Sequence, residues 1–571
     1  MCKKYIEPAA AVAKNKHFLY FLLVTFIFLL TGLDHDPWWK KGEAYSFGLI
    51  YHFYKTGTWL IPTNAGVPFM EKPPLYYWTG TIMCKLFGSW IPLHDAARLP
   101  SVLYMGITIL FLFLSGQAIF SLQPDRQSLL SRTSVFLFLG TYGTSLYGHS
   151  MSTDLALLAG TTVTLYGLIL LCKLPEQWKC AGISIGTGIG MVFLSKGLVL
   201  PVILSISGLC MSLLSPRFRW QEQTVKGTAL ACAVALPFFI IWPVLVYQYS
   251  PALFHEWFWD NNIGRFLGSS VAKLGAENHR LNLIYMLPVF GFPIFPLACF
   301  EVFRSRHEWQ RTEYLLPLII SVVGIGVLLL SASFRTIYIL PLFPGFCLLA
   351  AQGLMRLPPA FLSRWNGFVR IAFSIAGLGV WIIWWNILHP LGTRPFPWLI
   401  HWFDSLLAPD FIPEGSQTIT CFVALTVAAF WVLSFQLKGN SPLASARIFF
   451  MGSVLMWCTT HTLLMPWINE TKSFRSAVKS FEDYRDLSPY ANECVANYQL
   501  GENMAPMLEY FMHRDTPLPT IDLNEKLCPL FLTFTLRDAP VEIDPRWKMV
   551  WHGTRLRDIR DSELRLYERV K

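Results

Sequence analysis

The sequence predicts a polytopic α-helical membrane protein with a small α/β domain at its C-terminal end. Of the 571 residues, 53% are hydrophobic and only 14% are charged, and the mean hydropathy is +0.42. An ordinary soluble domain is about 25% charged. The charges are also unevenly spread, because residues 468–571 hold 32 of the 82 Asp, Glu, Lys and Arg residues. These observations argue against a soluble multidomain enzyme, a disordered chain and a coiled coil, and they divide the chain into a membrane body, 1–467, and a soluble tail, 468–571.

Thirteen segments are candidates for membrane-spanning helices, which need roughly 20 apolar residues each. They are residues 18–33, 101–120, 133–148, 154–172, 180–195, 197–214, 228–249, 282–302, 315–332, 336–354, 369–388, 417–436 and 448–467. The first is short and resembles the apolar part of a signal peptide. Because Asp34 follows it rather than a small-residue cleavage site, we interpret it as a retained helix.

The basic residues predict the orientation of these spans. If the N-terminus lies in the cytoplasm, every short loop on that side is basic, as the positive-inside rule requires. The basic loop residues are Arg126, Arg132, Lys173, Lys179, Arg217, Arg219, Lys226, Arg304, Arg306, Arg311, Arg356, Arg364, Arg370, Lys438 and Arg447. The net charge of +10 is therefore a topology signal, and the absence of a long Lys/Arg run argues against nucleic-acid binding. An odd number of spans places the tail outside the cytoplasm, where Cys494 and Cys528 could form a disulfide.

Three long segments then lie on the outer side: 34–100, 250–281 and 389–416. The first contains two aromatic-rich stretches, Ala44–Tyr54 and Leu75–Phe87, which are short for spans and typical of helices in the plane of the membrane interface. In the tail we expect a helix followed by short strands. The expected helix is Phe474–Tyr484, and the expected strands are Cys494–Tyr498, Leu530–Thr535 and Trp547–His552.

The first outer loop, 34–100, holds the side chains best suited to chemistry. It contains Asp34-His35-Asp36-Pro37, Gly42-Glu43-Ala44-Tyr45, Gly57-Thr58-Trp59-Leu60-Ile61-Pro62, Glu71-Lys72-Pro73-Pro74 and Ala96-Ala97-Arg98-Leu99-Pro100-Ser101. A carboxylate can accept the proton of an attacking hydroxyl or hold a metal ion, and a neighbouring Lys can stabilise a departing phosphate. A solvated loop with interfacial aromatic residues would have a similar composition.

The same motifs resemble the first periplasmic loop of the glycosyltransferase C superfamily, in the branch of protein O-mannosyltransferases and lipid A aminoarabinose transferases. The most specific element is Glu71-Lys72-Pro73-Pro74, followed by Tyr77-Trp78. One element departs from the family pattern, because the acidic pair Asp-Glu reads Gly42-Glu43 here. Either Glu43 takes over as the catalytic carboxylate, or Asp34 or Asp36 replaces the missing Asp. We favour Asp36 and Glu43 jointly.

The resemblance implies roles for further residues in the membrane body. Asp154 corresponds to a second family Asp, although it would also suit a helix N-cap. Lys196 corresponds to a Lys-Gly turn, although a Lys that snorkels to the interface would look the same. Together with Lys72, the residues expected to bind the donor phosphate are Lys196, Arg265, Arg335 and Tyr338. Glu71 and His279 are the expected ligands of a divalent metal (Zn²⁺, Mg²⁺ or Mn²⁺), although two ligands so distant in sequence are a weak metal signal.

The function implied by the resemblance is that of a glycosyltransferase in a bacterial inner membrane, with its active site facing the periplasm. The donor would be a polyprenyl-phosphate sugar, with undecaprenyl as the expected lipid. The acceptor would be lipid A or another glycolipid, a glycan or a protein. A single displacement would invert the anomeric carbon. Two other classes stay open: a transporter, which would carry ionisable residues near the membrane midplane, and an oligosaccharide polymerase, ligase or assembly protein on a similar scaffold.

Overall fold

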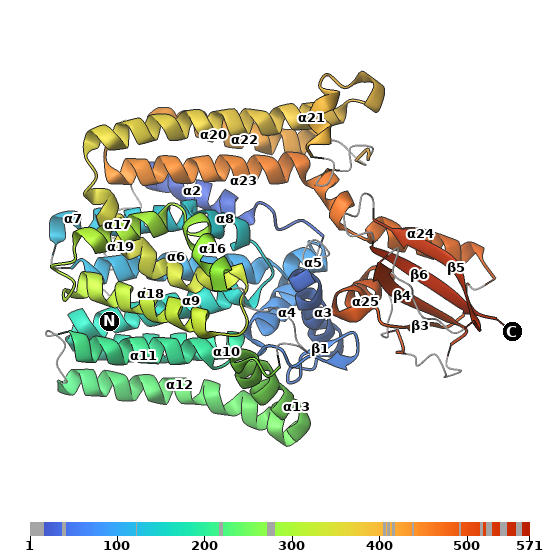
Figure 1. Ribbon diagram of the computed structural model, residues 1–571, viewed down its shortest axis with the longest axis horizontal. Coiled ribbons are helices and arrows are strands. Elements are labelled where there is room, and N and C mark those ends of the chain that lie inside the picture. The colour runs from blue at the N-terminus through green and yellow to red at the C-terminus, as the bar shows by residue number, and fades with distance from the viewer. Residues whose placement is uncertain are drawn as a thin grey trace.

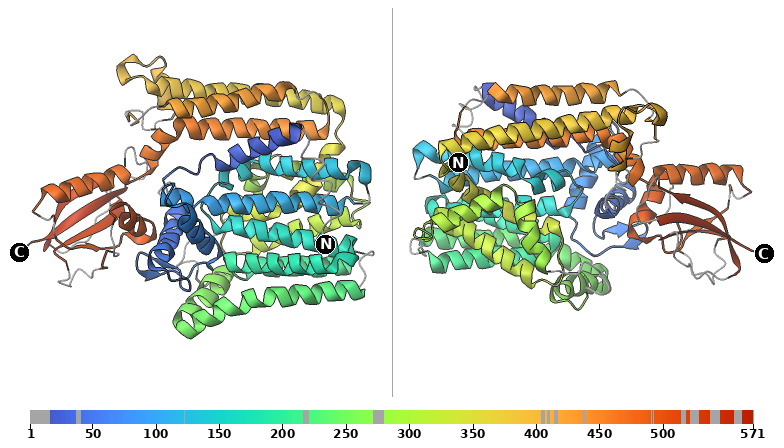
Figure 2. Two further views of the ribbon diagram at one scale, coloured as in Figure 1. Left: turned by 180° about the vertical axis from the view of Figure 1, so that it is seen from behind. Right: turned by 45° about the horizontal axis from the view of Figure 1, so that its top comes forward.

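The computed structural model places a bundle of long helices at one end of the molecule and a β-sheet with two helices at the other (Figure 1). It describes residues 16–36, 41–121, 123–215, 221–270, 280–403, 407, 411–413, 417–436, 439–489, 491, 493–513, 518–520, 528–536, 545–555 and 562–570. Three short helices of the first loop lie between the bundle and the sheet (Figures 1 and 2). The first loop and the tail therefore lie on the same side of the bundle, as the predicted topology requires.

Nine of the described helical segments are long and apolar enough to cross a membrane. Their main helices are α6 (Leu99–Ile119), α9 (Thr153–Lys173), α10 (Trp178–Lys196), α12 (Glu222–Tyr249), α18 (Thr312–Leu330), α19 (Phe343–Met355), α20 (Pro359–Leu388), α22 (Thr418–Leu433) and α23 (Pro442–Lys472). A tenth span results if α16 (Arg280–Phe290) and α17 (Ile294–Arg304), which are bent by 97°, cross the membrane together. The polytopic helical architecture is thus confirmed.

The full-length spans are fewer than the thirteen predicted, because the other three segments form short or broken helices. Predicted span 18–33 is α2 (Lys16–Leu30), and 197–214 is α11 (Val199–Leu214). Predicted span 133–148 is divided between α7 (Pro124–Gly140) and α8 (Tyr142–Tyr147). Apolar composition alone does not reveal such breaks.

The packing of α9 on α10 brings two predicted site residues together. A Cβ atom on Gly160 of α9 would lie 2.8 Å from the carbonyl oxygen of Gly188 on α10. Small residues allow helix backbones to approach this closely in a membrane, where packing relies on van der Waals contact. Because the two helices run antiparallel, the start of α9, with Asp154, lies beside the end of α10, with Lys196.

The two predicted interfacial helices of the first loop are confirmed as helices. They are α3 (Lys41–Thr56) and α4 (Leu75–Phe87), with β1 (Thr63–Asn64) and β2 (Val67–Pro68) between them and α5 (Leu93–Ala96) after them. Helix α3 packs against α25 (Gly501–Phe511) of the tail, and Lys55 forms an ion pair with Glu509 across this contact at 3.4 Å. The side-chain amide of Asn64 also donates to the carbonyl oxygen of Glu502 at 2.7 Å. The tail is therefore anchored on the first loop.

The tail forms a four-stranded mixed sheet in the order β3-β4-β6-β5. Its elements are α24 (Arg475–Leu487), β3 (Val495–Asn497), α25, β4 (Leu530–Leu536), β5 (Trp547–Thr554) and β6 (Ser562–Arg569). Strand β3 pairs with β4 in parallel, whereas β6 pairs antiparallel with both β4 and β5. The predicted helix and three strands are confirmed, and Cys494 and Cys528 are joined in a disulfide. Helix α25 and strand β6 were not predicted.

Short helical elements complete the connections. They are η2 (Pro175–Gln177), α13 (Pro251–His255), η3 (Glu256–Gly264), α14 (Arg265–Leu267), η4 (Thr336–Leu342), η5 (Leu391–Thr393), α21 (Pro397–His401) and η6 (Ser434–Gln436). Two of them carry predicted site residues: α14 contains Arg265 and η4 contains Tyr338.

Candidate active site

Asp154, Lys196 and Tyr338 form a contact group at the outer ends of α9 and α10. The Asp154 carboxylate is buried and forms an ion pair with the Lys196 ammonium. The ammonium also lies 3.7 Å from the centre of the Tyr338 ring, close enough for a cation–π interaction. The N-cap of α9 is Ser152, whose hydroxyl accepts from the Asp154 backbone N–H at 3.2 Å. Asp154 itself is therefore not the cap, and its carboxylate is directed to Lys196.

A second group, which we call the cationic cluster, consists of Tyr45, Glu71, Lys72, Arg265 and Arg335. Lys72 donates to the Tyr45 hydroxyl and lies 3.7 Å from the Glu71 carboxylate. The Arg265 guanidinium donates to the same carboxylate at 2.8 Å. Arg335 interacts with both Tyr45 and Glu71. Three cations thus face one carboxylate, which leaves an excess of positive charge at a largely buried site.

The protonation of Glu71 reflects this excess. Burial alone would raise the pKa of its carboxyl group, but the nearby charges of Lys72, Arg265 and Arg335 outweigh burial and lower the pKa to about 2. Glu71 is therefore ionised throughout the physiological range, and it holds the cations in place without neutralising them all.

Gly197 positions Arg265 relative to Lys196. Its φ of +79° belongs to the left-handed region that favours glycine, and a Cβ atom there would lie 1.8 Å from the Asn262 side-chain oxygen. That oxygen accepts from the Leu198 backbone N–H at 3.2 Å. The Asn262 amide also donates to the Trp257 carbonyl at 2.8 Å. The turn after α10 therefore anchors η3, and α14, which begins with Arg265, follows directly.

The two groups are adjacent. Arg335 interacts electrostatically with Tyr45 of the cationic cluster and with Tyr338, beside Lys196. The buried Tyr77 on α4 interacts with both Lys72 and Asp154. The structure therefore brings together seven predicted residues from five separate parts of the sequence: Glu71, Lys72, Asp154, Lys196, Arg265, Arg335 and Tyr338. The sequence had assigned no role to Tyr45 and Tyr77, although both lie inside the motifs of the first loop.

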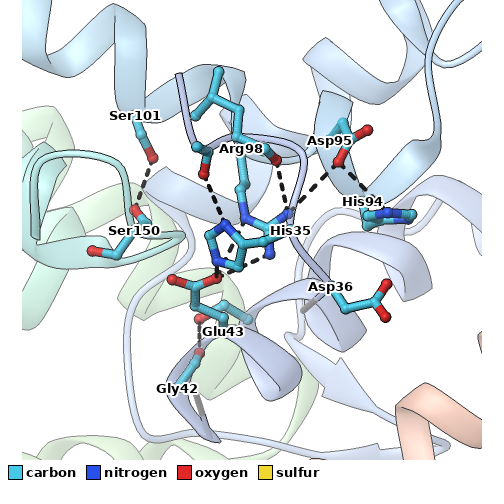
Figure 3. A network of polar contacts seen from close by, with 12 residues as sticks. His35, Asp36, Gly42, Glu43, His94, Asp95, Arg98, Ser101 and Ser150 are labelled. Atoms are coloured by element: carbon cyan, nitrogen blue, oxygen red, sulfur yellow. Dashed lines mark hydrogen bonds and ion pairs between the residues drawn. The ribbon is translucent and has the colours of Figure 1, made fainter. Parts of the chain in front are cut away.

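Glu43 belongs to a different, buried network (Figure 3). One of its oxygens accepts from Arg98 at 3.0 Å and lies 2.9 Å from the Nε2 atom of His35. Arg98 is completely buried and also donates to the Leu33 carbonyl at 3.0 Å. The other ring nitrogen of His35 lies 2.7 Å from the Gly32 carbonyl. Burial and the charge of Arg98 lower the pKa of His35, and the Glu43 carboxylate opposes this effect only in part. Glu43 is therefore engaged in holding the first loop together.

Asp36 lies at the edge of this network and points away from the Glu43 carboxylate (Figure 3). Its backbone N–H donates to Asn469 at 3.3 Å, and its carboxylate lies 4.0 Å from Arg475 at the start of α24. The structure thus places Asp36 at the junction between the first loop and the tail. The joint role of Asp36 and Glu43 as catalytic carboxylates stays a prediction.

Asp95 is an additional titratable group in this region. Burial raises the pKa of its carboxyl group to about 7, because Arg98 at 3.7 Å offsets this effect only in part and the charges of Asp34 and Asp36 add to it. The folded protein therefore favours protonated Asp95. Its contribution to stability is fully present below pH 4 and is lost as the pH rises to about 7.

Replacing Asp95 by Asn should remove this pH dependence. We expect the melting temperature of the wild-type protein in detergent to fall more between pH 5 and pH 8 than that of Asp95→Asn. The exposed Asp483 on α24 provides the control, because Asp483→Asn should keep the wild-type pH profile. Equal pH profiles for wild type and Asp95→Asn would show that the carboxyl group is already ionised at pH 5.

The predicted metal site is only partly described. His279 lies outside the described residues, and within the described part of the chain no group of three or more His, Cys, Asp or Glu residues could hold a metal ion. The charge of Glu71 is already compensated by the cations around it. Glu71 and its neighbours do not fit a divalent cation, because the positive charges of Lys72 and Arg265 would repel it.

The chain is similar to known proteins in both sequence and fold. Residues 71–247 match the family described as dolichyl-phosphate-mannose-protein mannosyltransferase. An undecaprenyl phosphate-alpha-4-amino-4-deoxy-L-arabinose arabinosyl transferase of Pseudomonas fluorescens is 22% identical over 448 residues, which cover 76% of this chain and 74% of the relative. The corresponding transferase of Aeromonas salmonicida is 27% identical over 351 residues, which cover 59% of each chain.

The fold is shared along almost the whole chain with a solved structure. The crystal structure of ArnT from Cupriavidus metallidurans bound to undecaprenyl phosphate superposes with a TM-score of 0.69 at 14% sequence identity, covering 96% of this chain and 97% of that chain. The chain is therefore similar to the mannosyltransferase family over residues 71–247 and to the aminoarabinosyl transferases over up to three quarters of its length, and it shares the fold of ArnT.

Proposed function

We propose that this protein transfers a sugar from undecaprenyl phosphate to an acceptor at the periplasmic face of a bacterial inner membrane. The observation that supports this most is the cationic cluster, in which Lys72, Arg265 and Arg335 face a single carboxylate, Glu71. A buried excess of positive charge suits a phosphate group. The names of the curated relatives, which are undecaprenyl-phosphate-dependent transferases, support the same donor.

The proposed reaction is a single displacement. An acceptor oxygen forms a bond to the anomeric carbon as the bond from that carbon to the phosphate oxygen breaks, so the configuration inverts. The electron pair of the broken bond stays on undecaprenyl phosphate, where Lys72, Arg265 and Arg335 stabilise the additional negative charge. Lys196, held between Asp154 and the Tyr338 ring, adds positive charge on the adjoining side.

The proton balance depends on the acceptor. If the acceptor is a hydroxyl group, its proton must pass to a carboxylate, and Asp36, Glu43 and Asp154 are the predicted candidates. If the acceptor is a phosphate, as in lipid A, it is already ionised and needs no base. We propose lipid A or another glycolipid as the leading acceptor and a protein as the second candidate. The second candidate is supported by the protein mannosyltransferase family match.

Localisation follows from the orientation of the spans. We propose a multi-pass inner-membrane protein with the short helices α2, α11 and α7–α8 completing thirteen crossings. The basic loops then lie in the cytoplasm, and the first loop, the tail and its disulfide lie in the periplasm.

Transfer of a labelled sugar tests the proposed function. Membranes that contain the protein would receive undecaprenyl phosphate carrying a radiolabelled 4-amino-4-deoxy-arabinose or a hexose, and lipid A, protein and glycan fractions would then be separated. We expect label in one of these fractions only when the protein is present. Absence of label from all three with every donor would contradict the proposal, whereas use of a lipid-linked oligosaccharide alone would indicate a polymerase.

A further inference from the structure

We propose that an apolar groove in the membrane bundle holds an acyl chain of a glycolipid acceptor; this inference rests on the proposed function. The groove is a cavity of about 900 Å³ between α8, α16, α20 and α23. This volume lies within the range of ligand-binding cavities, about 300–1,000 Å³. Its walls are almost entirely apolar and include Phe292, Phe368, Ala372 and Phe449.

The location of the groove determines the chemistry of its occupant. Helices α20 and α23 are both long enough to span the membrane, so the groove lies within the depth of the bilayer. Phe368 is 62% exposed and Phe292 is 39% exposed on the described surface, so the groove is accessible from the lipid side. A cavity bounded by spans and open to the bilayer is filled by hydrocarbon chains. The question is therefore which lipid supplies the chain.

One end of the groove reaches the turn at Thr31 and Gly32, which precedes the first loop. It is lined there by Trp457 and His461 of α23, and the Trp457 indole donates to the Thr31 carbonyl at 2.9 Å. Gly32, with a φ of +89°, packs so closely on this end that a Cβ atom would lie 2.8 Å from the His461 ring. The chain continues directly from Gly32 to the segment 34–43, which carries the acidic residues predicted to act on the acceptor.

The residues proposed to bind the donor phosphate lie away from the groove. Arg265 follows α13 and η3, which lie beside α12 at the edge of the bundle opposite α20 and α23 (Figure 1). The groove therefore ends at Thr31 and Gly32, just before the first loop, and lies across the bundle from Arg265. A lipid whose chain occupies the groove places its headgroup near the start of the first loop and away from Arg265, which favours an acceptor over the undecaprenyl chain of the donor.

Photo-crosslinking tests this proposal with lipid A as the probe. The full-length protein in nanodiscs would be irradiated with lipid A that carries a diazirine in one acyl chain. We expect saturable labelling of peptides from α20 and α23, lowered at least tenfold by excess unlabelled lipid A and unchanged by excess undecaprenyl phosphate. Equal competition by undecaprenyl phosphate, or labelling that does not saturate, would overturn the proposal.

A substitution that fills the groove provides the kinetic test. Ala372→Trp should raise the apparent KM for lipid A about tenfold or more and leave the affinity for undecaprenyl phosphate unchanged. Ile371→Trp is the matched control, because Ile371 precedes Ala372 on α20 but is 64% exposed and does not line the groove. If Ala372→Trp leaves the KM for lipid A unchanged while the wild type transfers sugar, the groove proposal is overturned and the proposed function stands. Transfer of label only to protein would also overturn the groove, whereas no transfer by the wild type to any acceptor would contradict the proposed function itself.

Discussion

Replacing Lys72 by Met should lower the rate of sugar transfer by about 100- to 1,000-fold, the effect expected when one group that stabilises transition-state charge is lost. Lys72 is 9% exposed, and its ammonium lies between the Tyr45 hydroxyl and the Glu71 carboxylate. Charge develops on the phosphate oxygen as the bond to the sugar breaks, and a preorganised ammonium stabilises that charge more than it stabilises the bound donor. The loss should therefore appear mainly in kcat.

Lys85→Met is the matched control for this prediction. Lys85 lies on α4 in the same loop, is exposed, and has its ammonium 5.1 Å from the Trp59 ring, and it takes no part in the cationic cluster. We expect this control to transfer sugar at close to the wild-type rate. Melting temperatures of both variants separate catalysis from folding. A Lys72→Met variant that melts like the wild type and still transfers sugar at more than a third of its rate would remove Lys72 from the proposed mechanism.

The charged residues of the cationic cluster could be selected from the sequence because most of them lie in compact motifs. Two motifs can be interpreted without knowledge of the rest of the fold, because each places a charge at the end of a helix or beside a tight turn. They are Glu71-Lys72-Pro73-Pro74 and the Lys196-Gly197 turn. What the sequence does not contain is the distance between Glu71 and Arg265, which are 194 residues apart and are joined at 2.8 Å by the packing of η3 on the bundle.

The acidic half of the site shows where sequence reasoning stops. A carboxylate next to a Tyr in an outer loop has the same sequence pattern whether it acts as a base or supports the fold. The partners of Glu43 decide between these roles, and the charged partner, Arg98, lies 55 residues further along the chain. Similarly, a run of apolar residues predicts a helix but not the 97° bend between α16 and α17. The charged residues of β6 form a strand because β6 pairs with β4 on one side and β5 on the other, which its sequence alone does not show.

Removal of Arg98 is expected to have the largest effect on stability. Arg98→Met leaves the Glu43 carboxylate buried without its guanidinium partner, and breaking a buried ion pair in this way costs about 3–5 kcal/mol. The melting temperature in detergent should fall clearly. Lys226→Met is the control, because Lys226 pairs at 2.5 Å with Glu222 at an exposed site, where such pairs contribute little to stability.

The double variant Arg98→Met/Glu43→Gln tests whether the unpaired charge of Glu43 causes this loss, and the single variant Glu43→Gln separates the two roles of Glu43. Because Gln carries no charge, we expect it to recover much of the stability lost in Arg98→Met. If Glu43 supports the fold, the folded fraction of Glu43→Gln should transfer sugar at close to the wild-type rate, while its melting temperature falls. If Glu43 is the base, transfer should be lost by a factor of about 100 or more at an unchanged melting temperature, because general base catalysis contributes roughly that much. The fixed contacts of Glu43 with Arg98 and His35 favour the first outcome, which would leave Asp36 or Asp154 to accept a proton from a hydroxyl acceptor, or no residue at all if the acceptor is a phosphate.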